Sequence, residues 1–203
     1  MREKCFMRKN KPSLIALLSK IKDKRSASGK RHEFIHILLL ITLGTMSGYE
    51  GYHGLAAFSK RFESELIDLL KIEREQTPCL STIRRVLISI DFNQLSGAFY
   101  KWIKPQVIIK KGEWMSCDGK GIKGTVTNYD RKHQNFVSLV SMYCSRVGVV
   151  LSARAMNNKE RGEIETLREL IESLDITGVI ITADAMHCQK KPCPSLQVNG
   201  MIT

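Results

Sequence analysis

The sequence has no apolar run long enough to cross a bilayer, which requires about 20 residues. Its most apolar stretch, FIHILLLITLGTM at residues 34–46, is shorter and contains His36 and Thr42. A long polar and basic segment precedes this stretch and no small-residue cleavage site follows it, which argues against a signal peptide. We therefore expect a buried helix here, a cytoplasmic protein, and no membrane partner.

Paired cysteine motifs are also missing. None of the six cysteines forms a CxxC pair, and their scatter among apolar runs favours reduced thiols in a cytoplasmic protein. Cys188 and Cys193, together with His187, lack the spacing of a zinc knuckle, and no second pair exists. Internal repeats and low-complexity tracts are absent as well, so neither a solenoid nor a zinc-stabilised fold is expected.

What the chain has in excess is positive charge. Its 203 residues carry a net charge of +12, with 43% hydrophobic and 26% charged residues, as in an ordinary protein of one large or two small domains. Residues 1–31 contain eleven Lys or Arg but only Glu3 and Asp23 as acidic residues. This segment is predicted to be a solvated basic arm, or else a contact for nucleic-acid phosphates through counterion release.

The pattern before Pro105 is helical. Ser81 and Asp91 stand where helix N-caps are expected. Residues 12–21 are expected to form a short amphipathic turn. Apolar residues three and four apart predict helices at residues 33–46, 52–61, 63–70, 82–90 and 92–102.

After Pro105 the pattern favours strands. Runs of β-forming residues predict strands at 114–117, 134–143 and 148–155, followed by an amphipathic helix at 163–174. A continuous apolar strand at 178–183, of the type buried on both faces, comes last. The order strand, strand, strand, helix, strand predicts an α/β domain and is the order in which ribonuclease H-like folds begin.

Two aspartates follow predicted strands. Asp118 and Asp184 would converge at one edge of the sheet if the first and fourth strands were parallel neighbours. Two close carboxylates repel each other unless a cation or a proton lies between them, and Mg²⁺ prefers such hard oxygen ligands. The alternative is that each aspartate forms a turn or a helix cap, which is common after strands.

The segment DGKGIKG surrounds the first aspartate with glycines and lysines. Lys120 and Lys123 could contact phosphates, and the glycines allow close approach of the backbone to a ligand. The segment lacks the spacing and the final Lys-Ser/Thr of a Walker loop.

Arg84 and Arg85 lie side by side near the start of the helix expected at 82–90. This helix could enter a DNA groove as a recognition helix. Equally, it could be a solvated basic helix that packs Ile83 and Val86 inward. The tyrosines at positions 49, 52 and 100 are expected in the core or at its rim rather than as base-stacking platforms.

Three segments resemble the DDE transposases of bacterial insertion sequences, in the group that contains the H-repeat-associated proteins. They are DGKGIKG at residues 118–124, NNKERGEIE at 157–165 and TADAMHCQKK at 182–191. The helical segment PCLSTIRRVLISID at 78–91 is also similar to the segment that precedes the catalytic domain in this group. The resemblance covers roughly residues 21–191.

This resemblance implies an all-α N-terminal domain followed by a ribonuclease H-like domain that cuts and joins transposon-end DNA. It implies Mg²⁺ (or Mn²⁺) held by two aspartates and a glutamate, with Asp118 and Asp184 as the aspartates. The corresponding division is a basic arm at 1–31, a helical domain at 32–104, a partial catalytic domain at 105–191 and an unmatched tail at 192–203.

The residues after Asp184 contain no Asp or Glu that could be the third carboxylate. The expectation is therefore a C-terminally truncated, inactive transposase, with DNA and a full-length transposase or further copies of itself as partners. Two alternatives remain open: a non-catalytic DNA-binding protein that competes with a full-length transposase, and a poorly soluble product without function.

Overall fold

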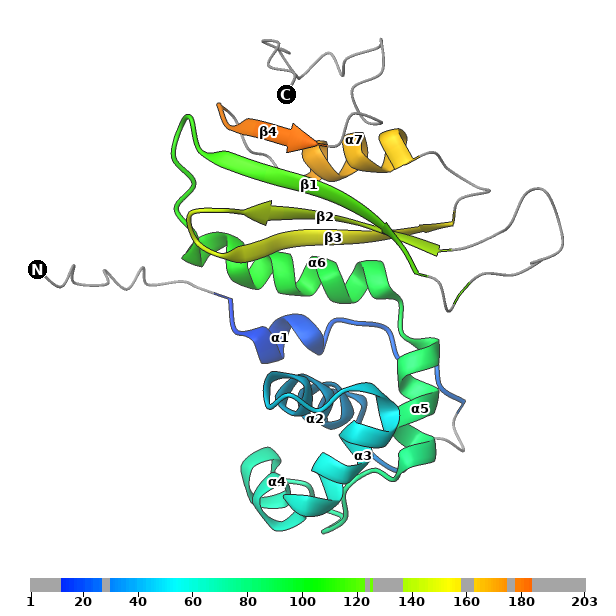
Figure 1. The fold of residues 1–203 in the computed structure, drawn as a ribbon. Coiled ribbons are helices and arrows are strands. Elements are labelled where there is room, and N and C mark those ends of the chain that lie inside the picture. Colours follow the sequence, from blue (N-terminus) through cyan, green and yellow to red (C-terminus); the bar gives the residue numbers. More distant parts are fainter. Residues whose placement is uncertain are drawn as a thin grey trace, which may run out of the picture. The chain divides into compact units, whose positions relative to one another are not determined.

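The computed structural model describes residues 12–26, 30–122, 125, 137–157, 163–174 and 178–183, and for residues 163 and 164 the backbone only. These residues form helices and a mixed four-stranded sheet, so the protein is α/β (Figure 1). The chain divides into two compact units, residues 1–98 and 99–203.

The first unit contains helices α1 to α5 and the beginning of α6. In chain order the helices are α1 (Leu14–Leu18), α2 (Phe34–Met46), α3 (Gly51–Arg61), α4 (Glu63–Leu70), α5 (Leu80–Ser89) and α6 (Phe92–Ile103). The predicted bounds of α4 are confirmed, α2 begins one residue later than expected because Glu33 is its N-cap, and α3 begins one residue earlier. Among the described residues no single helix is long and apolar enough to span a membrane. Helices α2 and α3 together have the necessary length and apolar composition, but the chain bends by 100° between them.

The core of this unit lies between α2, α3, α4 and α5. Its buried residues are Leu40, Leu55, Phe58, Leu66 and Ile83. Gly44 of α2 lets α3 approach closely, because a Cβ there would stand 2.7 Å from Cδ2 of Leu55 and 3.0 Å from Cδ1 of Phe58. The orientation of α3 on α2 therefore depends on a residue with no side chain.

Helix α5 begins two residues before its predicted start. Cys79, not Ser81, is the N-cap residue, because its extended backbone (φ −73°, ψ 165°) is followed at once by helix. The carbonyl of Cys79 accepts hydrogen bonds from the backbone N–H groups of Thr82 at 2.9 Å and Ile83 at 3.1 Å. The predicted cap at Asp91 is confirmed, since its Oδ1 accepts the backbone N–H groups of Asn93 and Gln94 at 3.0 and 3.3 Å.

The described part of the basic N-terminal segment is only partly solvated. Leu18 and Ile21 are buried, and the side chain of Arg25 is only 7% exposed. Arg25 donates to Asp23 from Nε and Nη2, both at 3.0 Å, and lies 5.4 Å from the centre of the Phe34 ring. Arg25 is therefore a packing residue, whereas a solvated arm was expected; residues 1–11 and 27–29 lie outside the described part.

The second unit contains the sheet. A 3-10 turn at Lys104–Gln106 follows α6. The regular elements after it are β1 (Trp114–Gly121), β2 (Val137–Cys144), β3 (Val149–Asn157), α7 (Glu163–Leu174) and β4 (Ile180–Ala183). The strand order is β3-β2-β1-β4, with β1 antiparallel to β2, β2 antiparallel to β3, and β1 parallel to β4.

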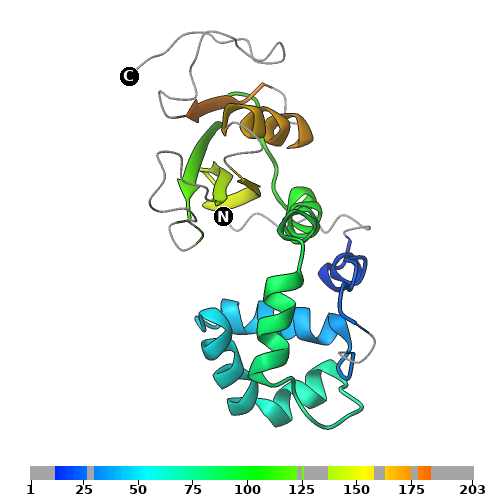
Figure 2. The same ribbon diagram turned by 90° about the vertical axis from the view of Figure 1, so that its right-hand side faces the viewer.

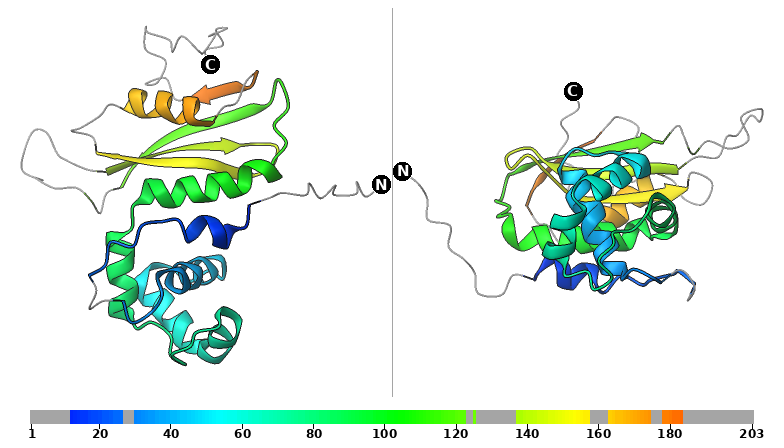
Figure 3. Two further views of the ribbon diagram at one scale, coloured as in Figure 1. Left: turned by 180° about the vertical axis from the view of Figure 1, so that it is seen from behind. Right: turned by 90° about the horizontal axis from the view of Figure 1, so that it is seen from below.

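Helix α7 covers one face of this sheet, which the view from behind in Figure 3 presents to the reader. Its bounds are those predicted, and it contacts β2 and β3. In β1 and β2 the side chains buried beneath it come from alternate positions, as a pleated sheet requires, and in β3 an irregularity in the register around Leu151 shifts this alternation. The buried cluster consists of Met115, Cys117, Val140, Met142, Cys144, Leu151, Met156, Leu167, Leu170, Ile171 and Leu174.

Two strand predictions are wrong in detail. Strand β1 does not end before Asp118 but continues to Gly121, because these additional residues pair with β2. Strand β4 is not buried on both faces: it is the edge of the described sheet, and Ile180 is 42% exposed. Its pairing partner Trp114 is 52% exposed on the same face. This is the face opposite the one that α7 covers, and Figure 2 shows α7 on one side of the sheet.

Candidate metal centre and nucleic-acid interface

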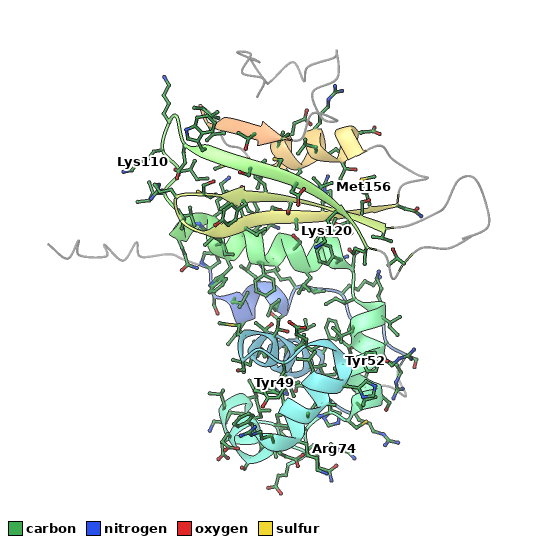
Figure 4. All side chains as sticks on the ribbon, viewed as in Figure 1. Tyr49, Tyr52, Arg74, Lys110, Lys120 and Met156 are labelled. Atoms are coloured by element: carbon green, nitrogen blue, oxygen red, sulfur yellow. The ribbon has the colours of Figure 1, made fainter. Side chains whose placement is uncertain are left out.

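Asp118 lies within β1, on the face of the sheet that α7 does not cover. Its Cα partner on β2 is Ser141, and its neighbour Cys117 points into the core. Because side chains alternate along a strand, Ser116 and Lys120 share the face of Asp118. Asp118 and Lys120 are exposed, so a carboxylate and an ammonium group lie on one open, polar stretch of β1 (Figure 4).

Strand β4 is the parallel neighbour of β1, which is the condition under which the two aspartates were expected to converge. The register pairs Ser116 with Thr182 and Cys117 with Ala183. The Thr182 hydroxyl donates toward Ser116 Oγ at 3.2 Å and lies 3.3 Å from the carbonyl of Met115. Side chains two residues before Asp118 and two residues before Asp184 are therefore in contact.

Asp184 and Lys123, both predicted site residues, lie outside the described residues. Within the described residues, no group of three or more His, Cys, Asp or Glu could hold a metal ion. The described part of the candidate centre thus consists of the Asp118 carboxylate, the contacting hydroxyls of Ser116 and Thr182, and the Lys120 amine.

Glu113, which the sequence reasoning did not single out, organises the start of β1. Its side chain is only 4% exposed and its Oε1 lies 2.5 Å from Nε of Arg146, in the turn between β2 and β3. Its carboxylate also accepts the backbone N–H of Lys110 at 2.9 Å and the thiol of Cys144 at 3.4 Å. Arg146 and then the Lys110 N–H stabilise the charged form, which lowers the pKa of Glu113 to about 2.

The main chain of Glu113 joins β1 to β4. Its carbonyl accepts the N–H of Ile180 at 2.8 Å, and Gly112 donates its N–H to the carbonyl of Gly178 at 2.6 Å. Nη2 of Arg146 donates to Oε2 of Glu113 at 3.3 Å and also to the carbonyl of Ile108. An ion pair between the buried Glu113 carboxylate and the half-exposed Arg146 therefore fixes the loop before β1 at the point where the parallel pairing with β4 begins.

The described thiols differ in reactivity. Cys79, Cys117 and Cys144 are free, as expected for reduced cysteines. Burial raises the pKa of Cys117 to about 12, so this thiol beside Asp118 is neutral and packs as a small apolar group. Cys79 is exposed, and hydrogen bonds from Ser81 and Thr82 lower its pKa to about 6.

Arg84 and Arg85 lie on the exposed side of α5. Both a DNA recognition helix and a solvated basic helix would place them there. Ile83 and Val86 are fully buried on the other side. The guanidinium of Arg84 lies 5.7 Å from the centre of the Tyr52 ring, and Nε of Arg85 donates to the carbonyl of Ser81 at 3.1 Å. Both arginines are therefore held against the protein, with further N–H donors left over.

Comparisons with known proteins agree on one family. A family model described as DDE_Tnp_1-associated matches residues 15–103, which include α1 to α6. The search of solved structures found no match.

Curated bacterial relatives match over most of this chain. "Putative transposase YncI" of Escherichia coli O157:H7 is 30% identical over 181 residues, which are 88% of this chain and 45% of that protein. "H repeat-associated putative transposase YhhI" of Escherichia coli K12 is 27% identical over 191 residues, which are 92% of this chain and 48% of that protein. "H repeat-associated putative transposase YbfD" of the same strain is 28% identical over 188 residues, 92% of this chain and 72% of that protein. The chain thus spans about half the length of the first two relatives and nearly three quarters of the third.

Proposed function

We propose that this chain, which belongs to the transposase family of the H repeat-associated proteins, binds DNA and holds a divalent metal ion between Asp118 and Asp184. The observation that carries this proposal is the parallel pairing of β1 with β4, in which Cys117 and Ala183 are partners. Asp118 is the next residue of β1, and Asp184 follows Ala183 in the sequence. Because consecutive Cα atoms are about 3.8 Å apart, each aspartate is one residue away from one of these two partners, and in the proposal one metal ion reaches both carboxylates.

The sheet supports a ribonuclease H-like fold. Three antiparallel strands are followed by a helix and then by a strand that returns parallel to the first. In α/β sheets, ligands collect at the carboxyl ends of such parallel strands. The proposed metal ion would lie at the carboxyl end of β4, next to the middle of β1.

The described residues fit a hard divalent cation. The Asp118 carboxylate is exposed on a polar part of the sheet, so a hydrated ion can reach it. Magnesium binds through one or two protein carboxylates and keeps water or phosphate oxygens as its other ligands. Asp118 and Asp184 would hold Mg²⁺ or Mn²⁺, and the ion would supply activation of the attacking oxygen and stabilisation of the leaving oxygen in phosphodiester cleavage.

The other residues of this face have complementary tasks. Lys120 offers an exposed ammonium group to a DNA phosphate and so brings the backbone toward Asp118. Lys123 has the same task in the proposal. Ser116 and Thr182, in contact with each other, fix the spacing of the two strands immediately before the carboxylates.

Metal binding tests this function directly. Titration of the 203-residue chain with Mn²⁺, followed by the loss of the free-ion electron paramagnetic resonance signal, should show one site that Mg²⁺ displaces. Asp118→Asn and Asp184→Asn should each weaken binding at least 10-fold, since each removes one of two charged ligands. Asp68→Asn, which removes an exposed carboxylate from α4, is the control and should bind like the unmodified chain.

Two results would reject the proposal. One is the absence of any Mn²⁺ site in the unmodified chain. The other is equal binding by Asp118→Asn and Asp68→Asn. The alternative of a non-catalytic DNA-binding protein is favoured by no separate observation, and it predicts salt-dependent DNA binding that Asp118→Asn and Mn²⁺ leave unchanged.

A further inference from the structure

Helices α3 and α5 together form an exposed face on which aromatic rings and basic side chains are in contact. Tyr52, in the first turn of α3, is 38% exposed, and the guanidinium of Arg84 on α5 lies 5.7 Å from its ring centre. The ring of His53 lies 4.6 Å from the ring of Tyr52. Three exposed side chains from two helices therefore lie side by side, with the Tyr52 ring in the middle and the two rings tilted by 40°.

The two helices are held in a fixed relation by the core beneath them. Leu55 and Phe58 of α3 pack in the same buried cluster as Ile83 of α5. Because the three stacked residues project from this packed pair, their positions are set by the fold.

Charge is segregated in this unit. Helices α3 and α5 carry Lys60, Arg61, Arg84 and Arg85 and no acidic residue. Helix α4, which lies between them in the chain, carries Glu63, Glu65 and Asp68 and no basic residue. His53 and Lys60 are seven residues apart, which places them on one side of α3. The basic charge is thus concentrated on α3 and α5, next to the stack.

We propose that the α3–α5 face, formed by Tyr52, His53, Lys60, Arg84 and Arg85, is the surface that binds the phosphate backbone of duplex DNA. Within it, Tyr52 is a positioning residue that holds Arg84 toward the phosphates. This inference rests on the proposed DNA-binding function and assigns it to one surface. A polyanion is the partner that fits a face whose two helices carry four Lys or Arg and no acidic residue within their bounds, with Glu50 at the N-cap of α3 as the nearest acidic residue in the chain, and guanidinium groups bind phosphate with two parallel hydrogen bonds.

Tyr52 works through Arg84 and not as a platform for a base. Its ring already contacts the guanidinium of one residue and the imidazole of another. An arginine that stacks on a ring loses fewer conformations when it binds a phosphate than a free arginine does. The stack therefore raises affinity by restraining Arg84 before DNA arrives.

The experiment uses fluorescence anisotropy with a labelled duplex of mixed sequence, about 30 base pairs long, across a range of salt concentrations. Arg84→Gln should weaken binding and lower the slope of log K against log salt by about 1, since one phosphate contact is lost. Tyr52→Leu should weaken binding by about 2- to 5-fold, the range of an exposed cation–π contact. Tyr52→Phe keeps the ring and should bind like the unmodified chain.

A double variant separates positioning from a direct contact. If Tyr52 acts through Arg84, then Tyr52→Leu should weaken binding no further in an Arg84→Gln background. Arg74→Gln removes the same charge from an exposed position away from Tyr52 and is the matched control (Figure 4). Circular dichroism of each variant confirms that the helices are intact.

Each outcome decides something. If the unmodified chain shows no salt-dependent binding to the duplex, DNA binding itself is wrong. If it binds, but Arg84→Gln weakens binding no more than Arg74→Gln does, the α3–α5 surface is wrong while DNA binding stands. If Tyr52→Leu weakens binding equally with and without Arg84, or if Tyr52→Phe fails to restore it, Tyr52 does not position Arg84.

Discussion

Replacing Tyr100 with phenylalanine removes one hydrogen bond that joins the end of α6 to the end of α7. The Tyr100 hydroxyl donates to the carbonyl of Leu174 at 2.6 Å, and Nζ of Lys104, four residues later, donates to the same carbonyl at 3.3 Å. Leu174 is the last residue of α7, so this carbonyl has no partner within the helix. The two donors therefore cap the C-terminus of the helix that covers the sheet.

The expected cost follows from what remains after the change. A net intramolecular hydrogen bond is worth about 1 kcal/mol, and leaving a buried acceptor without a partner costs about 1–3 kcal/mol. In Tyr100→Phe the carbonyl of Leu174 keeps Lys104 as a donor, and the ring keeps its contact with the lysine, whose Nζ lies 5.6 Å from the ring centre. We therefore expect a loss of about 1 kcal/mol, which lowers the melting temperature of a unit of about 100 residues by about 4–8 °C.

Tryptophan fluorescence gives a selective assay, because Trp102 and Trp114 both belong to the second unit. Urea unfolding followed by this signal reports on the sheet and its helices. Tyr143→Phe is the matched control: its side chain is 40% exposed, so water replaces the hydroxyl, and its effect should stay below about 0.5 kcal/mol.

The double variant Tyr100→Phe, Lys104→Met tests the shared acceptor. Each single change leaves one donor, so the double change should cost more than the sum of the two, by about 0.5 kcal/mol or more. The reasoning is refuted if Tyr100→Phe costs no more than Tyr143→Phe. Strict additivity of the two changes would show that the donors do not share the Leu174 carbonyl.

Two further predictions concern single groups in each unit. Since the pKa of Glu113 is lowered to about 2, its charge stabilises the folded state fully above its ordinary pKa of 4.5, and this contribution is lost as pH falls from 4.5 toward 2. The difference in urea midpoint between the unmodified chain and Glu113→Gln should therefore shrink over that pH window, and a constant difference would contradict it. Gly44→Ala should destabilise the first unit by about 1–3 kcal/mol, because its Cβ would stand 2.7 Å from Leu55. Gly97→Ala, which meets nothing within 4 Å, should be neutral or stabilising by up to about 1 kcal/mol in melts followed by circular dichroism.

The sequence predicted those elements whose signal is local. Helix α7 begins and ends where expected, since apolar periodicity defines its interior, and α2 ends where expected because Gly48 follows it. Asp91 caps α6 as its side chain and position suggested. Element type and order followed from the same local patterns, whereas the parallel pairing of the first and fourth strands was only a condition in the sequence reasoning and comes from the structure.

What the sequence did not predict depends on contacts between distant residues. The last residues of β1, Gly119 to Gly121, have no apolar pattern and are in the strand because β2 pairs with them. Glu113 and Arg146 are far apart in the chain, and nothing near either residue indicates that they form a buried ion pair. Tyr52 was expected in the core or at its rim, and its contact with Arg84 likewise requires that α3 and α5 be packed together first.

The register of β4 is the structural condition on which the proposed metal centre depends, and it is determined at the end of the strand remote from Asp118. The hydrogen bonds from Gly112 to Gly178 and from Ile180 to Glu113 start the pairing. Gly178 has φ +70°, and a Cβ there would stand 3.0 Å from Cγ of Lys111, so the turn tolerates only glycine without strain. A slip of one residue would turn Thr182 toward the core and Ala183 away from it, because the side-chain period of a strand is two. The Glu113–Arg146 ion pair and the glycine at position 178 therefore oppose a change of register, and through the register they control which side chains of β4 share the face of Asp118.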